Sequence, residues 1–277
     1  MPATVAIAHG DDPRAMLFSA LEGIAAAEVV KPDDVVVVKP NFVEPMLPET
    51  GVTTDPRVIA ALVEWLQYQG VRHITIAEGS ASDTRTERAF ALLGLPELAA
   101  RYGVRLVNAF RDEREEVTIP RALSLRRVQL SRTIYEATCL ISLAKLKCHS
   151  MSGVTLGVKN LMGAVVPDHE IMHRELDKRL ADLATVLRPK LCLIDGLVGS
   201  ERHETAGSPV QTDVLLAGAD PVATDVVGTM VMGRNPAEIE HLALCAARGL
   251  GESDPAQIEI VGTPLAQVRK KYRRSYW

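Results

Sequence analysis

Short runs of β-branched residues alternate along this chain with amphipathic segments of ten to sixteen residues. Such alternation is typical of crossover helices that cover a largely parallel sheet. Residues 35–38 are all valine, which indicates a strand that is buried on both faces. The chain is therefore predicted to be an α/β protein, with a largely parallel or mixed central sheet covered by helices on both faces.

The same pattern places the individual elements. Asp-Pro pairs at positions 12, 55 and 220 are typical helix starts. Residues 116–130 favour two short strands, a small antiparallel excursion from the main sheet. The predicted strands are residues 4–8, 35–38, 74–77, 139–143, 191–194 and 214–217, and the predicted helices are residues 15–29, 57–69, 155–165, 175–187 and 221–232.

Length and charge limit the kind of protein this is. A chain of 277 residues suits one large domain or two small ones, and we expect a single domain over residues 1–277, with two lobes dividing near 110–140 as the alternative. A net charge of −4 and 4% aromatic residues argue against non-specific nucleic-acid binding. Apolar runs of strand length only, and residues 1–12 without export features, predict a cytoplasmic protein that does not enter the membrane.

The cysteines are scattered. Cys139, Cys148, Cys192 and Cys245 include no C-x-x-C pair, so we expect neither a zinc knuckle nor an iron–sulfur cluster within this chain. Lysines near Cys148 would lower its thiol pKa. Adjacent residues of a strand point to opposite faces, however, so Cys148 and His149 are not expected to act as a nucleophile and base pair.

A basic cluster follows the predicted strand at residues 139–143. Lys145, Lys147 and His149 alternate with other residues, so an extended backbone would send all three to one side. Three donors on one face suit an anion. The alternative is that the lysines protect an edge strand from aggregation.

A second polar group lies just downstream. A helix over residues 155–165 would bring Thr155 and Lys159 together at i,i+4, with Asn160 beside them. The spacing of glycines differs from that of a phosphate loop, and no G-x-G-x-x-G follows the first strand. The segment therefore indicates anion binding but no nucleotide.

Other polar residues follow predicted strands. Lys39 and Asn41 are two positions apart at a strand end, where open α/β sheets bind ligands. Thr54 belongs to a cluster that either binds an anion or caps the next helix. Glu78 is interpreted as a base, a metal ligand or the partner of a central lysine, and a buried pair of that kind would shift both pKa values.

A metal site is a further hypothesis. His169 and His173 have the i,i+4 spacing that lets two imidazoles reach one cation from a helix. Asp195 ends a strand, and Glu204 lies in a glycine-bearing loop that we interpret as a lid. These four residues are the predicted ligands of a divalent metal. The alternative for the histidines is an exposed helix start.

The C-terminal tail is basic and aromatic. Residues 269–277 carry five positive charges with two tyrosines and a tryptophan. The tail is interpreted as a solvated or subunit-packing segment of a homo-oligomer, with docking to a partner as the alternative.

Taken together, these motifs resemble the domain of unknown function 362 family over most of the chain. The pieces that carry the resemblance are Lys39-Pro40-Asn41-Phe42, residues 141–149, Thr155, residues 158–163, His173, residues 181–183, residues 194–196, and residues 217–223 with Asp225. The family commonly has a Glu-Gly-x-Gly-Pro turn after Asp-Gly, whereas residues 204–209 here are Glu-Thr-Ala-Gly-Ser-Pro.

The resemblance implies an α/β domain with a polar, lysine-rich site, and it brings no established reaction. Family members are often joined to or encoded with ferredoxin-like iron–sulfur modules. No such module is present in this sequence, so any electron transfer would need a separate ferredoxin-like partner.

Three functional hypotheses follow. The first is an enzyme that acts on a small anionic substrate, bearing carboxylate or phosphate, by lysine-assisted binding and acid–base, metal-assisted or redox-linked chemistry. The second is a non-catalytic module that binds an anionic metabolite or an iron–sulfur protein, and the third treats the lysines as surface residues. In the first, His149, Lys147 and Glu78 are catalytic, and the substrate is bound by Lys39, Asn41, Thr54, Lys145, Thr155, Lys159 and Asn160.

Overall fold

A computed structural model describes residues 2–206 and 208–274. The last three residues of the basic tail, 275–277, lie outside the described residues. Among the described residues, no helix combines the length and the apolar character needed to cross a membrane.

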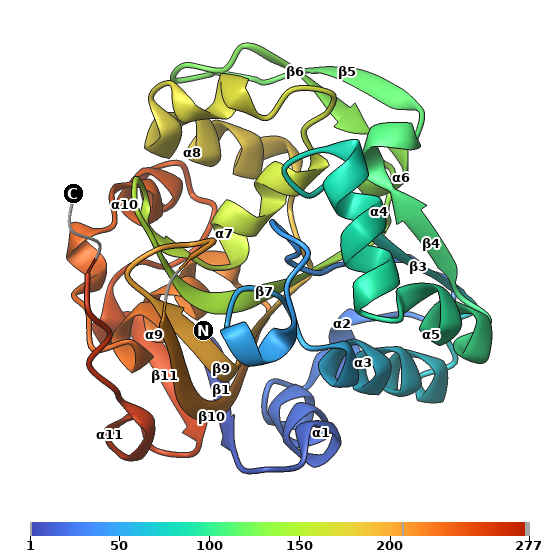
Figure 1. The fold of residues 1–277 in the computed structure, drawn as a ribbon. Helices are drawn as coiled ribbons and strands as arrows, with labels where there is room; N and C mark the ends of the chain where they lie inside the picture. Colours follow the sequence, from blue (N-terminus) through green and yellow to red (C-terminus); the bar gives the residue numbers. More distant parts are fainter. Residues whose placement is uncertain (1, 207, 275–277) are drawn as a thin grey trace.

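The centre of the molecule is a mixed, mostly parallel sheet, as predicted (Figure 1). Among its described strands, only β10 and the short β8 run against the others. The order is β11-β1-β10-β9-β7-β2-β3-β4, with β8 paired to β7. The strands are β1 Ala3–His9, β2 Val35–Lys39, β3 His73–Glu78, β4 Arg105–Asn108, β7 Cys139–His149, β8 Gly153–Thr155, β9 Leu191–Glu201, β10 Ser208–Gly218 and β11 Ile258–Gly262.

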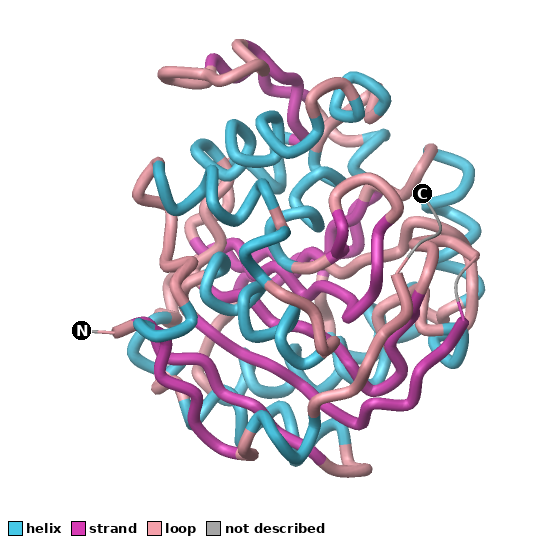
Figure 2. Tube along the Cα trace, turned by 90° about the vertical axis from the view of Figure 1, so that its left-hand side faces the viewer, coloured by secondary structure: helices cyan, strands magenta, loops and turns pink. Residues whose placement is uncertain are grey.

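Helices pack on both faces of this sheet, which Figure 2 shows from the side. One apolar core lies under α1 Pro13–Gly23, α3 Pro56–Tyr68, α4 Asp83–Leu92 and α5 Leu95–Tyr102. The other lies under α7 Gly157–Asn160, α8 Leu176–Val186, α9 Pro221–Val231 and α10 Glu240–Ala247. The remaining short helices are α2 Ala26–Val29, α6 Arg132–Tyr135 and α11 Leu265–Val268.

The predicted antiparallel excursion is confirmed. Strands β5 Arg114–Thr118 and β6 Arg127–Ser131 form a separate two-stranded sheet, seen at the top of Figure 1. The predicted helix starts are confirmed too. The carboxylates of Asp12, Asp55 and Asp220 accept hydrogen bonds from backbone N–H groups in the first turns of α1, α3 and α9.

Two predicted helices are wrong in detail. The helix expected over residues 15–29 is interrupted at Ala25, whose φ of 50° is left-handed and separates α1 from α2. The helix expected over residues 155–165 is replaced by three pieces: the end of β8, the single turn of α7 and a 3-10 helix over Leu161–Ala164. Thr155 therefore lies on a strand, because the chain turns back along β7 before any helix begins.

The long strand β7 positions the site. It pairs with β2 only as far as Ser142, so its second half extends beyond β2 and runs between β9 and β8. All eleven of its residues are buried. Its alternating residues Leu146 and Cys148 face one core, which leaves Lys145, Lys147 and His149 on the other side, as the period of a strand requires.

Candidate functional site

A cavity of about 300 Å³ lies where β2, β3 and β7 end. This is the carboxyl end of the parallel strands, the place where ligands bind in open α/β sheets. Three lysines from separate parts of the sequence meet there. The lining residues used below are Lys39, Asn41, Glu78, Lys147, His149, Thr155, Lys159, Asn160, His169, His173 and Glu204.

Lys39 is fully engaged with protein partners. Its Nζ donates to Glu78 Oε2 at 2.9 Å, to the Pro40 carbonyl at 3.1 Å and to Asn160 Oδ1 at 3.1 Å. Burial lowers the pKa of Lys39 and raises the pKa of Glu78, and the attraction between the two charges opposes both changes. Of the roles weighed for Glu78, the geometry therefore matches the partner of a lysine.

Asn160 joins three elements around this pair. Its Oδ1 accepts from Asn41 Nδ2 at 3.1 Å as well as from Lys39, and its Nδ2 donates to the Lys39 carbonyl and to Ser142 Oγ. Thr54 does not line the cavity. It accepts from the Asn41 backbone N–H and donates to the Leu143 carbonyl, so it holds Asn41 in place from behind.

Lys147 and Lys159 are buried without a carboxylate partner. Neither forms an ion pair within 4.0 Å among the described residues. The Nζ of Lys147 donates to the Val52 carbonyl at 2.8 Å, and that of Lys159 lies 3.1 Å from Met162 Sδ. Burial, with the charge of Lys159 next, lowers the pKa of Lys147 to about 7. Burial also lowers the pKa of Lys159 to about 8, although Glu204 opposes the change.

His149 is held as a neutral donor. Its Nδ1 accepts from the backbone N–H groups of Met151 and Ser152 at 3.1 and 3.2 Å, so the ring proton sits on Nε2. Burial and then the charge of Lys159 lower its pKa to about 3. The ring therefore suits donation of a hydrogen bond into the cavity better than the proton transfer expected from the sequence.

Glu204 is the acid nearest to His149, with Oε1 3.9 Å from Nε2. It accepts from the N–H and the hydroxyl of Ser150, both at 2.9 Å. Burial raises its pKa, but these hydrogen bonds favour the carboxylate, and the pKa lies below its usual value. Glu204 is therefore ionised at neutral pH.

Three further polar atoms in the wall have no protein partner. Thr155 Oγ1, Asn41 Oδ1 and His169 Nε2 are buried, and none makes a hydrogen bond to the part of the chain that the structure describes. Buried polar atoms are almost always hydrogen-bonded. They lie beside two lysines that form no ion pair with the described residues, which makes this cavity the candidate site.

Lys145 does not join the other three lysines, contrary to the prediction. Its Nζ pairs with Asp195 Oδ2 at 2.7 Å, and both side chains are fully buried. Asp195 also accepts from the backbone N–H groups of Asp55 and Leu197. The reason is register: Lys145 and Asp195 are direct neighbours on β7 and β9, so the carboxylate takes this lysine away from the cavity.

The residues proposed as metal ligands do not all come together. His169, His173 and Glu204 line the cavity, whereas Asp195 lies outside it. The α-helical spacing expected of the histidines is not formed, because Glu170–His173 is a 3-10 helix and the His169 ring packs against Phe110. In residues 2–206 and 208–274, no group of three or more His, Cys, Asp or Glu side chains is placed to hold a metal ion.

Cys148 faces away from the lysines, as predicted from strand alternation. Its thiol contacts the carbonyl of Arg273 and the guanidinium of Arg234. Burial raises its pKa, which is opposite to the effect expected from nearby lysines. A nucleophilic role for Cys148 therefore has no support in this environment.

Some contributors carry no clear sequence signal. The carbonyl of Val52 anchors Lys147, and backbone atoms leave no trace in side-chain patterns. Asp225 accepts from the N–H groups of Gly157 and Val158 at 2.6 and 2.8 Å and so fixes the turn that presents Lys159. Burial raises the pKa of Asp225 to about 7. Asp225 belongs to the motifs that carry the family resemblance, but nothing in the sequence indicated its contact with Gly157 and Val158.

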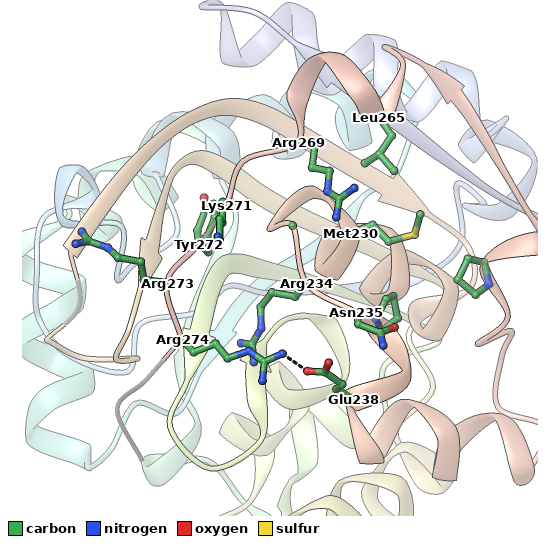
Figure 3. A pocket seen from close by; sticks show the side chains of 13 residues that line it. Met230, Arg234, Asn235, Glu238, Leu265, Arg269, Lys271, Tyr272, Arg273 and Arg274 are labelled. Carbon is green, nitrogen blue, oxygen red and sulfur yellow. Dashed lines mark hydrogen bonds and ion pairs between the residues drawn. The ribbon is translucent and has the colours of Figure 1, made fainter.

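A larger cavity of about 910 Å³ lies near the C-terminus (Figure 3). Four arginines line its wall, and protein groups already engage three of them. Arg234 donates to the Gly153 carbonyl, Arg273 pairs with Glu201, and Arg274 pairs with Glu238. The side chains of Arg273 and Arg274 are about 60% exposed, at 61% and 63%. Its exposed ion pairs mark this cavity as a solvated basic groove, although Arg234 Nε in its wall is buried without a hydrogen-bond partner in the part of the chain that the structure describes.

The family model described as "Domain of unknown function (DUF362)" matches residues 36–230, a segment that contains the site. This chain belongs to that family. The match covers every lysine of the cavity, and it also covers Asp195 and Asp225. The resemblance inferred from the motifs is thereby confirmed.

This chain is similar in sequence to a protein from Synechocystis and in structure to an apoprotein from Thermoanaerobacterium. The thylakoid-associated protein sll1697 of Synechocystis sp. (strain ATCC 27184 / PCC 6803 / Kazusa) is 30% identical over 253 residues, 87% of this chain and 75% of that protein. The lactate racemase apoprotein from Thermoanaerobacterium thermosaccharolyticum aligns with a TM-score of 0.44 at 12% identity, over 83% of this chain and 57% of that one. At that TM-score the likeness supports no inference about activity. The cytoplasmic location and the ferredoxin-like partner stay predictions.

Proposed function

We propose that this chain is an enzyme that binds a small carboxylate- or phosphate-bearing substrate in the lysine cavity and transfers a proton there. One observation carries the proposal: Lys147 and Lys159 are buried beside the cavity and have no carboxylate partner among residues 2–206 and 208–274. A buried charge that lacks a partner is costly. An anionic substrate is the partner that would offset this cost.

The charges around the cavity support an anion. Glu78 neutralises Lys39, and Arg85 pairs with Glu44 at 2.7 Å. Lys147 and Lys159 then remain against Glu204, which is partly buried, and Glu170, which is exposed at the wall of the cavity. The unpartnered hydroxyl of Thr155 and the Nε2–H of His149 add neutral donors to the same wall.

The protonation states support acid–base chemistry. A lysine with a pKa of about 7 is present in both forms near neutral pH, which is the condition for an efficient general acid or base. Lys147 is therefore assigned the proton transfer. Neutral His149 is assigned hydrogen bonding to the substrate, and Lys159 is assigned the anion.

Isothermal titration with phosphate and with oxalate tests the binding step. Lys159→Gln should weaken binding of the preferred anion at least about tenfold, because a charge-assisted contact is lost. Lys178→Gln is the matched control, since Lys178 is half-exposed and pairs with Glu175 outside the cavity. Equal affinities in the wild type and Lys159→Gln, or no binding of either anion, would contradict the proposal.

Proton exchange tests the catalytic step. The protein is incubated in D2O with a panel of small carboxylates, and loss of substrate C–H signal is followed by proton NMR. Lys147→Met should abolish the exchange, whereas Lys178→Gln should not change it. An anion that binds without any exchange across the panel would favour the non-catalytic module.

A further inference from the structure

We propose that Lys147 is a nucleophile that forms a Schiff base with a short oxo acid, whose carbonyl lies one or two bonds from its carboxylate. The inference rests on the proposed function, because it needs an anion in the lysine cavity. It adds the substrate class and a covalent step, in which the imine formed by Lys147 activates the neighbouring C–H bond in place of direct proton transfer by the free amine.

Hydrogen bonding leaves the amine of Lys147 available. Lys39 uses its three donor positions on protein acceptors, and Lys145 is locked to Asp195. Within the described residues, the Lys147 amine makes one hydrogen bond, to the Val52 carbonyl at 2.8 Å. A neutral amine can donate that bond and still present its lone pair, so Val52 fixes the position of Nζ without consuming its reactivity.

Strand pairing places a carboxylate-binding group beside this amine. Lys147 and Thr155 are direct partners in the antiparallel pair of β7 and β8, and such partners have Cβ atoms about 5 Å apart on the same face. Thr155 Oγ1 is buried and unpartnered within the described chain. A carboxylate held by Thr155 and Lys159 would put a carbonyl one or two bonds away next to Lys147.

His149 completes the arrangement. It lies two residues after Lys147 on the same strand and therefore on the same face. Its Nδ1 accepts two backbone N–H groups, so Nε2–H is the donor that remains for a carbonyl oxygen. A neutral donor there polarises the carbonyl without adding a third buried positive charge.

The protonation state fits a nucleophile. Burial and the neighbouring ammonium group of Lys159 lower the pKa of Lys147 to about 7. Desolvation and a nearby cation are the two ways in which proteins activate lysine for Schiff-base formation. A substantial fraction of Lys147 is then the free amine at neutral pH.

The step balances without a further reactant. The Nζ lone pair forms the C–N bond while the carbonyl π electrons move to oxygen, which takes up a proton. The resulting carbinolamine loses its hydroxyl as water, with one more proton supplied by the Lys159 ammonium and returned to it from solvent. Transfer of an N–H proton to solvent accompanies the addition, and the product is a protonated imine. Nothing is oxidised or reduced.

Borohydride trapping tests the inference. The full chain is incubated with pyruvate, a 2-oxo acid, or acetoacetate, a 3-oxo acid, then reduced and mapped by mass spectrometry after proteolysis. We expect one reduced adduct at Lys147 with at least one of them. Lys147→Arg should lose the adduct, and Lys178→Arg should keep it. Thr155→Val, which keeps the shape of the side chain, should lower the yield about fivefold through one lost hydrogen bond.

Two outcomes overturn the inference. If neither acid labels Lys147, or if adducts spread over exposed lysines and are unaffected by Thr155→Val, Lys147 is not the nucleophile. Oxalate binding separates this failure from failure of the proposed function. If oxalate binds through Lys159 but no Lys147 adduct forms, the proposed anion site is retained and the Schiff-base inference fails. If there is neither oxalate binding nor an adduct, both proposals fail.

Discussion

Lys145 and Lys147 are two residues apart on β7, point to the same side and are both fully buried, yet their surroundings differ. Lys145 pairs with Asp195 at 2.7 Å, whereas the one hydrogen bond of the Lys147 amine to the described chain goes to a backbone carbonyl. The contrast teaches that burial alone does not separate a structural lysine from a functional one. The presence or absence of a carboxylate partner does.

The register of β9 produces this difference. Lys145 lies beside Asp195, but an irregularity follows, and Lys147 lies beside Ser200. A strand irregularity next to a site can redirect side chains in this way. The same strand therefore supplies a compensated charge at one position and an uncompensated one two residues later.

The largest effect is expected at the compensated lysine. Asp195→Ala leaves Lys145 buried without a partner and also removes the acceptor of the Asp55 and Leu197 N–H groups. We expect the free energy of unfolding to fall by about 3 to 5 kcal/mol, measured by urea denaturation. A loss below about 1 kcal/mol would show that the pair is not structural.

The pH dependence of stability should come from the uncompensated lysine. The pKa of Lys147 is 10.5 in the unfolded chain and about 7 in the fold, so between these values the unfolded state binds more protons. Stability should rise with pH across this window, by at most about 1.4 kcal/mol per pH unit. Below pH 7 the amine is protonated in both states, so the cost of burying its charge applies in full. The free energy of unfolding, measured by urea denaturation at several pH values from 7 to 9, should rise less with pH for Lys147→Met than for the wild type. Equal slopes would contradict the lowered pKa.

A smaller change in stability is expected from Lys147→Met itself at neutral pH. The substitution removes a buried charge that has no ion-pair partner, so the free energy of unfolding should stay within about 1 kcal/mol of the wild type or rise. Urea denaturation beside Asp195→Ala makes the comparison direct. A loss of 3 kcal/mol or more would mean that Lys147 is as structural as Lys145.

The smallest effect is expected at Thr155. Its buried hydroxyl has no partner among the described residues, so Thr155→Val should change the free energy of unfolding by no more than about 0.5 kcal/mol while weakening anion binding. Thermal denaturation with and without oxalate measures both. A large loss of stability without ligand would place Thr155 in the fold and not in the site.

Most of the architecture could be predicted from the sequence. Apolar runs such as residues 35–38 and the Asp-Pro pairs report local preferences, and local preferences fixed the strands and helix starts. The helix predicted over residues 155–165 was wrong because its helical spacing competed with pairing to β7. That pairing is a tertiary contact, which the periodicity of the sequence does not report. The residues of the site could be predicted from their residue types and from their positions at the ends of predicted strands.

Their partners could not be predicted in the same way. The pairing of Lys145 with Asp195 depends on the register of β7 against β9, and the anchoring of Lys147 depends on a backbone carbonyl. Nothing in the residue types distinguishes the two lysines. The structure separates them because it places the carboxylates.

The most direct test of the account is the titration of the Lys147 amine by heteronuclear NMR on lysine-labelled protein, with the resonance assigned by its loss in Lys147→Arg. We predict titration near pH 7 and a pKa raised by about one unit or more when oxalate saturates the cavity. Titration near 10.5, unchanged by oxalate, would contradict the claim that Lys147 is an uncompensated charge in an anion site.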